Sequence, residues 1–219
     1  MRLFGTVVKI LFFLIVLAAA VYSFLKFREL QMMQKIVERL TADSRIAEVM
    51  VTDVKFDPLT QKTYTTIKFL EYDTELKPLP PKYFTFSSDI IQFQSLVIRF
   101  DDYFVKTGHP LKGKSAYLFM KVFTLGDKRA EVCKINIINE IPSGYVVEGA
   151  KNSFEKKIWE KFWQYALNPQ EAKKIGVKNL QVEAPGTKFV PGMIYTIKIE
   201  HDGGMRIDAQ PLPEILKKG

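Results

Sequence analysis

The chain has 219 residues, of which 47% are hydrophobic and 26% charged, and its formal net charge is +8. That length suits one large domain or two small ones, and the ordinary composition excludes disorder over most of the chain. A single cysteine, Cys133, excludes an intrachain disulfide framework and any cysteine-based zinc or iron–sulfur site, and there are only two histidines. No metal and no cofactor is therefore expected.

The N-terminal segment is strongly apolar. Residues 10–25 read ILFFLIVLAAAVYSFL and contain no charge. Together with residues 3–8 they would span about 34 Å as a helix, enough for a hydrocarbon core of roughly 30 Å, with Lys9 extending to the headgroups. This pattern predicts a single membrane-spanning helix, a signal anchor, over residues 1–25. A cleaved signal peptide and a buried core helix are the alternatives.

The predicted anchor implies a location. A long domain after a short N-terminal tail commonly crosses with its anchor, although basic residues lie on both sides of this one. We therefore expect a single-pass protein of the inner (cytoplasmic) membrane with a periplasmic C-terminal domain. The expected partners are the lipid bilayer and other membrane or envelope proteins. Nucleic acid is not expected, because the chain has no Lys/Arg run that could follow a phosphate backbone.

A helical stalk is predicted over residues 26–43, which are rich in helix-forming residues and lack glycine and proline. Its apolar residues follow the 3, 4, 3 spacing of a short heptad seam. They would either mediate self-association or pack on the following domain; they are Leu30, Met33, Val37 and Leu40.

From residue 44 to residue 216 the apolar period changes mainly to two, which predicts antiparallel strands. The clearest hairpin joins residues 193–199 to 205–210 through a His-Asp-Gly-Gly turn. Residues 153–167 have the spacing of an amphipathic helix, whose Trp159 and Trp163 would pack on the sheet or anchor a partner. The predicted fold class is α+β: one mainly antiparallel β domain with one aromatic helix and a C-terminal hairpin.

A phosphate-loop-like motif ends at Ser115. Gly108, Gly113, Lys114 and Ser115 fit the pattern G-x-x-x-x-G-K-[ST], in which backbone amides and the lysine bind phosphates. The motif requires a helix after the loop, whereas residues 116–123 are aromatic and β-branched and predict a strand. A surface loop is the favoured interpretation, and whether Ser115 begins a helix or a strand decides between the two.

The predicted function follows from the anchor, the stalk and the ordered domain. We expect a non-catalytic accessory or scaffold subunit of a cell-envelope membrane complex, which acts through protein–protein contacts of its extramembrane domain. One alternative is a nucleotide-binding enzyme that uses the segment 108–115. Another is a ligand-binding envelope module with a pocket between the aromatic helix and the sheet.

Overall fold

The computed structural model describes residues 2–39, 45–100, 115–125, 130–146, 156, 159–160, 163, 167–168, 170, 177–200 and 204–213. Side chains are described for only part of the helix and not for residues 99–100 and 177–181. The chain forms two compact units, Met1–Ile36 and Val37–Gly219. Each unit is described by itself.

Helix α1, Arg2–Arg39, supplies the first unit. It runs without a break through the segments predicted as anchor and stalk, as far as Arg39. From residue 9 onward it contains no glycine or proline, and its many Leu, Ala, Glu, Gln, Lys and Met residues favour a helix. Its side chains over residues 9–25 are exposed.

The predicted membrane span is not supported by the described residues, which contain no helix both long and apolar enough to cross a bilayer. This finding contradicts three predictions: the single-pass helix, the signal anchor, and the inner-membrane location with a periplasmic domain.

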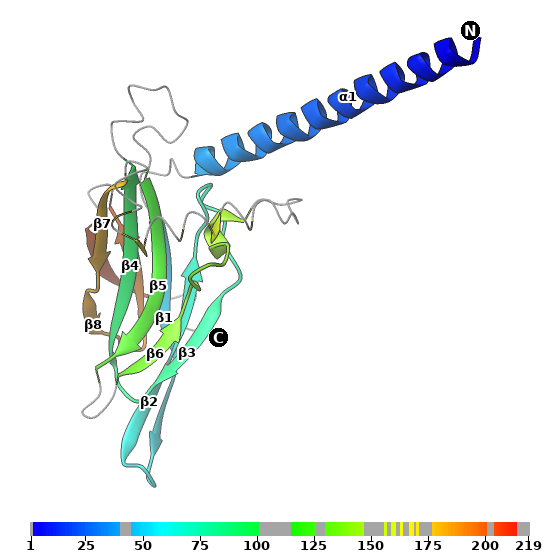
Figure 1. Ribbon diagram of the computed structural model, residues 1–219. Coiled ribbons are helices and arrows are strands. Elements are labelled where there is room, and N and C mark those ends of the chain that lie inside the picture. The colour runs from blue at the N-terminus through cyan, green and yellow to red at the C-terminus, as the bar shows by residue number, and fades with distance from the viewer. Residues whose placement is uncertain are drawn as a thin grey trace. The chain divides into compact units, whose positions relative to one another are not determined.

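Two antiparallel sheets make up the second unit (Figure 1). The first sheet has the order β10-β9-β1-β2-β3 and the second the order β6-β5-β4-β7, with β8 also paired to β4. The strands of the first are β1 Arg45–Asp57, β2 Lys62–Glu71, β3 Lys82–Phe86, β9 Met193–Ile199 and β10 Met205–Pro211. Those of the second are β4 Ile90–Phe100, β5 Ser115–Thr124, β6 Glu131–Lys134, β7 Val177–Glu183 and β8 Gly186–Lys188. The short 3-10 helix η1, Ser143–Tyr145, follows β6.

The hydrophobic core lies between the two sheets. Phe69 of β2 is fully buried, and its ring centroid lies 5.7 Å from that of Phe93 in β4 and 5.5 Å from that of Phe119 in β5. Residues from β1, β3 and β9 join the same buried cluster. Each sheet thus covers the apolar face of the other, which is the arrangement of a β-sandwich.

This arrangement corrects the predicted fold class. The described part of the chain is mostly β, and the α+β prediction is wrong. The reason is that the second sheet, rather than a helix, covers the inner face of the first. Within the segment 153–167 the described residues 156, 159, 160, 163 and 167 are helical, and the others lie outside the description.

The prediction of the last hairpin is confirmed. Strands β9 and β10 pair antiparallel, with Ile197 opposite Ile207. Tyr195, Ile197 and Ile199 are buried, and Met205 and Ile207 pack against the core. Residues 201–203 of its turn lie outside the described residues. The strict alternation of apolar and polar residues was sufficient here, because one face meets a core and the other meets water.

Candidate functional site

A buried ion pair joins the ends of two neighbouring strands in the first sheet. Arg45, the first residue of β1, is 1% exposed, and Glu71, the last residue of β2, is 3% exposed. The Arg45 Nε and Nη2 groups donate to Glu71 Oε1 at 3.1 and 3.0 Å, and Nη1 donates to the Gly144 carbonyl oxygen at 3.3 Å. Paired and hydrogen-bonded charges of this kind are the form in which ionised groups are tolerated in a protein interior.

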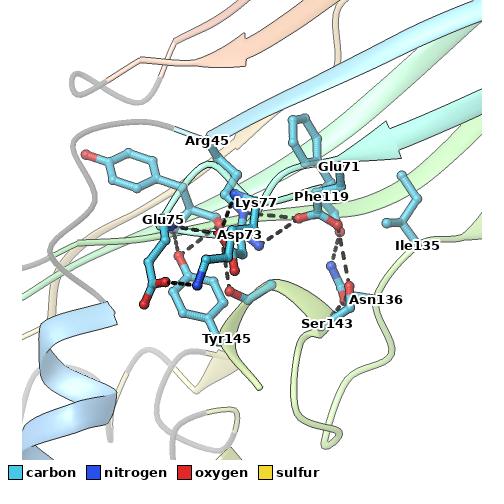
Figure 2. Close-up of polar contacts among 12 residues, drawn as sticks. Arg45, Glu71, Asp73, Glu75, Lys77, Phe119, Ile135, Asn136, Ser143 and Tyr145 are labelled. Atoms are coloured by element: carbon cyan, nitrogen blue, oxygen red, sulfur yellow. Dashed lines mark hydrogen bonds and ion pairs between the residues drawn. The ribbon is translucent and has the colours of Figure 1, made fainter. Parts of the chain in front are cut away.

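The pair belongs to a polar network that joins both sheets through the segment after β6 (Figure 2). Ser143 Oγ lies within hydrogen-bond distance of Glu71, at 3.4 Å, and of Asn136 Oδ1, at 3.3 Å. Asn136 Nδ2 donates to the Phe119 carbonyl oxygen of β5 at 2.7 Å. The buried Arg45 of the first sheet is thereby connected to the backbone of the second.

Tyr145 makes a second connection between the sheets. The guanidinium carbon of Arg45 lies 4.8 Å from the centroid of its ring, within cation–π range. Its hydroxyl donates to the Tyr117 carbonyl oxygen at 3.1 Å and accepts from the Tyr117 amide at 3.0 Å. The ring face of Tyr145 thus contacts the Arg45 cation, and its hydroxyl bonds to the backbone of β5.

Burial dominates the electrostatics of this network. It raises the pKa of the Glu71 carboxyl above its ordinary value, and the Arg45 guanidinium opposes part of that rise. Burial also raises the pKa of the Tyr145 hydroxyl. Arg45 and Glu71 are enclosed and bonded to each other, and the network around them connects the two sheets.

The exposed candidate site is the far end of the β1–β2 hairpin. Strand β9 pairs with β1 only up to Met50, and β3 pairs with β2 only from Thr65 onward. The remaining part, residues 51–64, therefore extends past both neighbouring strands as a two-stranded ribbon, the lower end of the sheet in Figure 1. We call these residues the hairpin arm.

A β-bulge keeps apolar side chains on one face of the hairpin arm. Val51 is opposite Ile67, but Val54 is opposite Thr65, because the register shifts between Val51 and Asp53. The inward positions of β1 are therefore odd-numbered up to Val51 and even-numbered beyond it. Val54 and Phe56 continue the core face beyond the sandwich, where their exposed fractions are 44% and 60%.

The tip of the hairpin arm is held by local hydrogen bonds. Asp57 accepts from the Leu59 amide at 2.9 Å and from the Thr60 hydroxyl at 2.7 Å. These two bonds lower the pKa of the Asp57 carboxyl, the Thr60 hydroxyl contributing most. Leu59 at the tip is 93% exposed. An ordered turn with an exposed leucine side chain is suited to contact with another apolar surface.

Trp159 and Trp163, for which packing on the sheet and anchoring a partner were the two alternatives, have buried side chains. Trp159 is 1% exposed and Trp163 is 0% exposed. The Trp163 indole Nε1 donates to the Glu140 carbonyl oxygen at 2.7 Å, and the Trp159 ring lies 5.5 Å from that of Tyr145. Trp159 therefore packs beside the Arg45 network, and the side chains of both tryptophans are buried.

The predicted stalk residues and most of the loop motif are not described. Leu30, Met33 and Val37 belong to α1 but their side chains, like Leu40 as a whole, lie outside the description. Gly108, Gly113 and Lys114 also lie outside it. Ser115 begins strand β5. The residues after the motif thus form a strand and not the helix whose N-terminus would meet a phosphate.

Sequence reasoning missed Arg45, Glu71 and Gly144. A signal was present for the first two: Arg45 shares the inward parity of Ala47 and Val49, and Glu71 shares that of Ile67 and Phe69. Opposite charges at inward positions of two neighbouring strands predict a buried pair. Comparison with protein-family models, with curated proteins and with solved structures found no match to this chain.

Proposed function

We propose that the β-sandwich is a non-catalytic, scaffold-type protein-interaction module that binds partner proteins through its hairpin arm. The observation that carries this proposal is the exposed apolar side chains of Val54, Phe56 and Leu59 on a ribbon that extends beyond the sandwich. Large apolar side chains placed together outside the core are typical of protein-binding surfaces.

The buried polar network supports a binding role for the rest of the domain. Arg45 and Glu71 are enclosed and bonded to each other within the first sheet, and the groups around them reach the backbone of the second sheet. A sandwich connected in this way is a rigid base for the hairpin arm. Rigidity favours binding, because less conformational entropy is lost when the partner docks.

The test is recovery of partners with the full chain carrying Phe56→Ser and Leu59→Ser. We expect partner recovery to fall at least about tenfold, since central apolar anchors carry most of an interface's binding energy. Leu125→Ser is the matched control, because Leu125 is 69% exposed but lies after β5, outside the hairpin arm. If the control loses partners as strongly as the hairpin variant, or if the hairpin variant keeps them, the proposal is wrong.

A further inference from the structure

We propose that the open edge of β1 in the hairpin arm pairs antiparallel with the same edge of a second copy of this chain. The inference rests on the proposed binding role of the hairpin arm and names its partner. It starts from the pairing pattern: among the described strands, none lies beside residues 51–57 of β1 on the side away from β2. An open edge exposes unpaired amide and carbonyl groups that can bind another strand.

The charges along this edge are self-complementary. Asp53 and Lys55 lie on the outward face of the hairpin arm and form an exposed ion pair at 3.0 Å. In an antiparallel pair of copies centred on Val54, Asp53 of each copy is opposite Lys55 of the other. The four charges then alternate in sign, and the two Val54 side chains meet on the apolar face. A two-fold axis produces both contacts at once.

Other registers fit less well. Centring the pair on Lys55 places Lys55 opposite Lys55 and Asp53 opposite Asp57, so like charges oppose each other. Centring it on Phe56 places Lys55 opposite Asp57, but β1 ends at Asp57, whose carboxylate is already bonded to the turn. The register centred on Val54 is the one of these three that places opposite charges against each other entirely within residues 53–55, between the bulge and the turn.

The same features explain why the edge would not bind strands indiscriminately. A lysine and a bulge on an edge strand are devices that discourage unwanted pairing. Lys55 and the bulge near Thr52 are both present here. Only a strand with an acidic residue opposite Lys55 and a basic residue opposite Asp53 removes the charge penalty, and a second copy supplies both.

Disulfide cross-linking of the full chain tests the register. In a Cys133→Ser background, which removes the native cysteine, Val54→Cys places two thiols opposite each other at the two-fold axis. Directly opposite residues have Cβ atoms about 4.5–5.5 Å apart, close enough for oxidation to link them. We expect Val54→Cys to form a cross-linked dimer at least about tenfold faster than Phe56→Cys. Phe56 is the more exposed of the two, so random collisions would favour the opposite order.

Charge reversal gives a matched second test in the Val54→Cys background. Asp53→Lys and Lys55→Asp each create like-charge pairs, and each should lower the association constant roughly tenfold. The double variant Asp53→Lys/Lys55→Asp restores alternation and should recover cross-linking. Circular dichroism of each variant establishes that it is folded.

The inference is overturned if Val54→Cys links no faster than Phe56→Cys, or if the double charge variant stays as weak as the single ones. The proposed function is tested separately, because Phe56→Ser/Leu59→Ser removes apolar anchors and leaves the charges of the edge intact. Partner loss in that variant without specific Val54 cross-linking would support the binding role and reject the second copy as its partner.

Discussion

The Arg45 guanidinium and the Glu71 carboxylate lie 3.0 Å apart, with side-chain exposures of only 1% and 4%. Each is at the end of a strand in the first sheet, and their neighbours reach the backbone of the second. The two side chains therefore depend on each other, because either one alone would be a buried charge without a counter-ion.

Removing one partner of this pair should be costly. We expect Arg45→Met to destabilise the fold by about 3–5 kcal/mol, while Arg45→Met/Glu71→Met should recover much of that loss. Chemical denaturation of Arg45→Met, Glu71→Met and the double variant measures the coupling.

The loss in Arg45→Met should also depend on pH. Burial already raises the Glu71 pKa, and removal of the cation raises it further. A raised pKa means that stability falls as pH rises through the folded-state value, so the deficit should be smaller in acid than at neutral pH. A double variant as unstable as Arg45→Met at all pH values would contradict this account.

Gly144 is predicted to be intolerant of any side chain. A Cβ atom at this position would overlap the Arg45 guanidinium. Gly144→Ala should therefore cost about 3 kcal/mol or more, because the arginine must leave its site. Gly192→Ala is the comparison, since its Cβ would meet open space and only its positive φ of 81° costs energy, roughly 1–2 kcal/mol. Thermal unfolding measures both.

A combination of variants tests whether Arg45 is the cause. In an Arg45→Met background the clash with the guanidinium is gone, so Gly144→Ala should cost clearly less than in the native chain. Equal costs in the two backgrounds would show that the backbone, and not the arginine, rejects the methyl group.

Glu131 should contribute stability that disappears in acid. Its carboxylate accepts hydrogen bonds from the Ser87 hydroxyl and, at 2.9 Å, from the Ser87 amide. The hydroxyl bond is the main cause of a pKa below the ordinary value of 4.5. A lowered pKa gives stability that is present above 4.5 and is lost as pH falls through the folded-state value.

The corresponding measurement compares denaturant midpoints at pH 7 and pH 3. Glu131→Gln and Ser87→Ala should both be less stable than the native chain at pH 7 and should differ from it less at pH 3. A Ser87→Ala midpoint equal to that of the native chain at pH 7 would contradict this role for the hydroxyl.

Truncation of two phenylalanines in the first sheet should have very different effects on stability. Phe69 is fully buried among other rings, so Phe69→Ala should cost about 3–5 kcal/mol. Phe56 is 60% exposed on the hairpin arm, so Phe56→Ala should change stability by no more than about 0.5 kcal/mol. A large loss for Phe56→Ala would mean that its ring packs within the domain and is not free for a partner.

The contrast between the two rings shows how far the sequence could predict the site. Alternation of apolar and polar residues predicted strands through both Val49–Val51 and Val54–Phe56. It could not show that β9 pairs with β1 only as far as Met50, because strand pairing joins residues that are far apart in the chain. The same pattern is therefore core in one half of β1 and exposed surface in the other.

The sequence by itself determined the strand pattern of β1, the β9–β10 hairpin and the strand that begins at Ser115. These depend on local periodicity and turn residues, which act over a few positions. Tertiary structure decided that two sheets cover each other, that the tryptophans are buried, and that Arg45 meets Glu71. The last contact joins residues 26 positions apart, and the contact of Arg45 with Gly144 spans 99. Only the packing of distant segments brings such groups together and sets whether a charge lies in the core or in water.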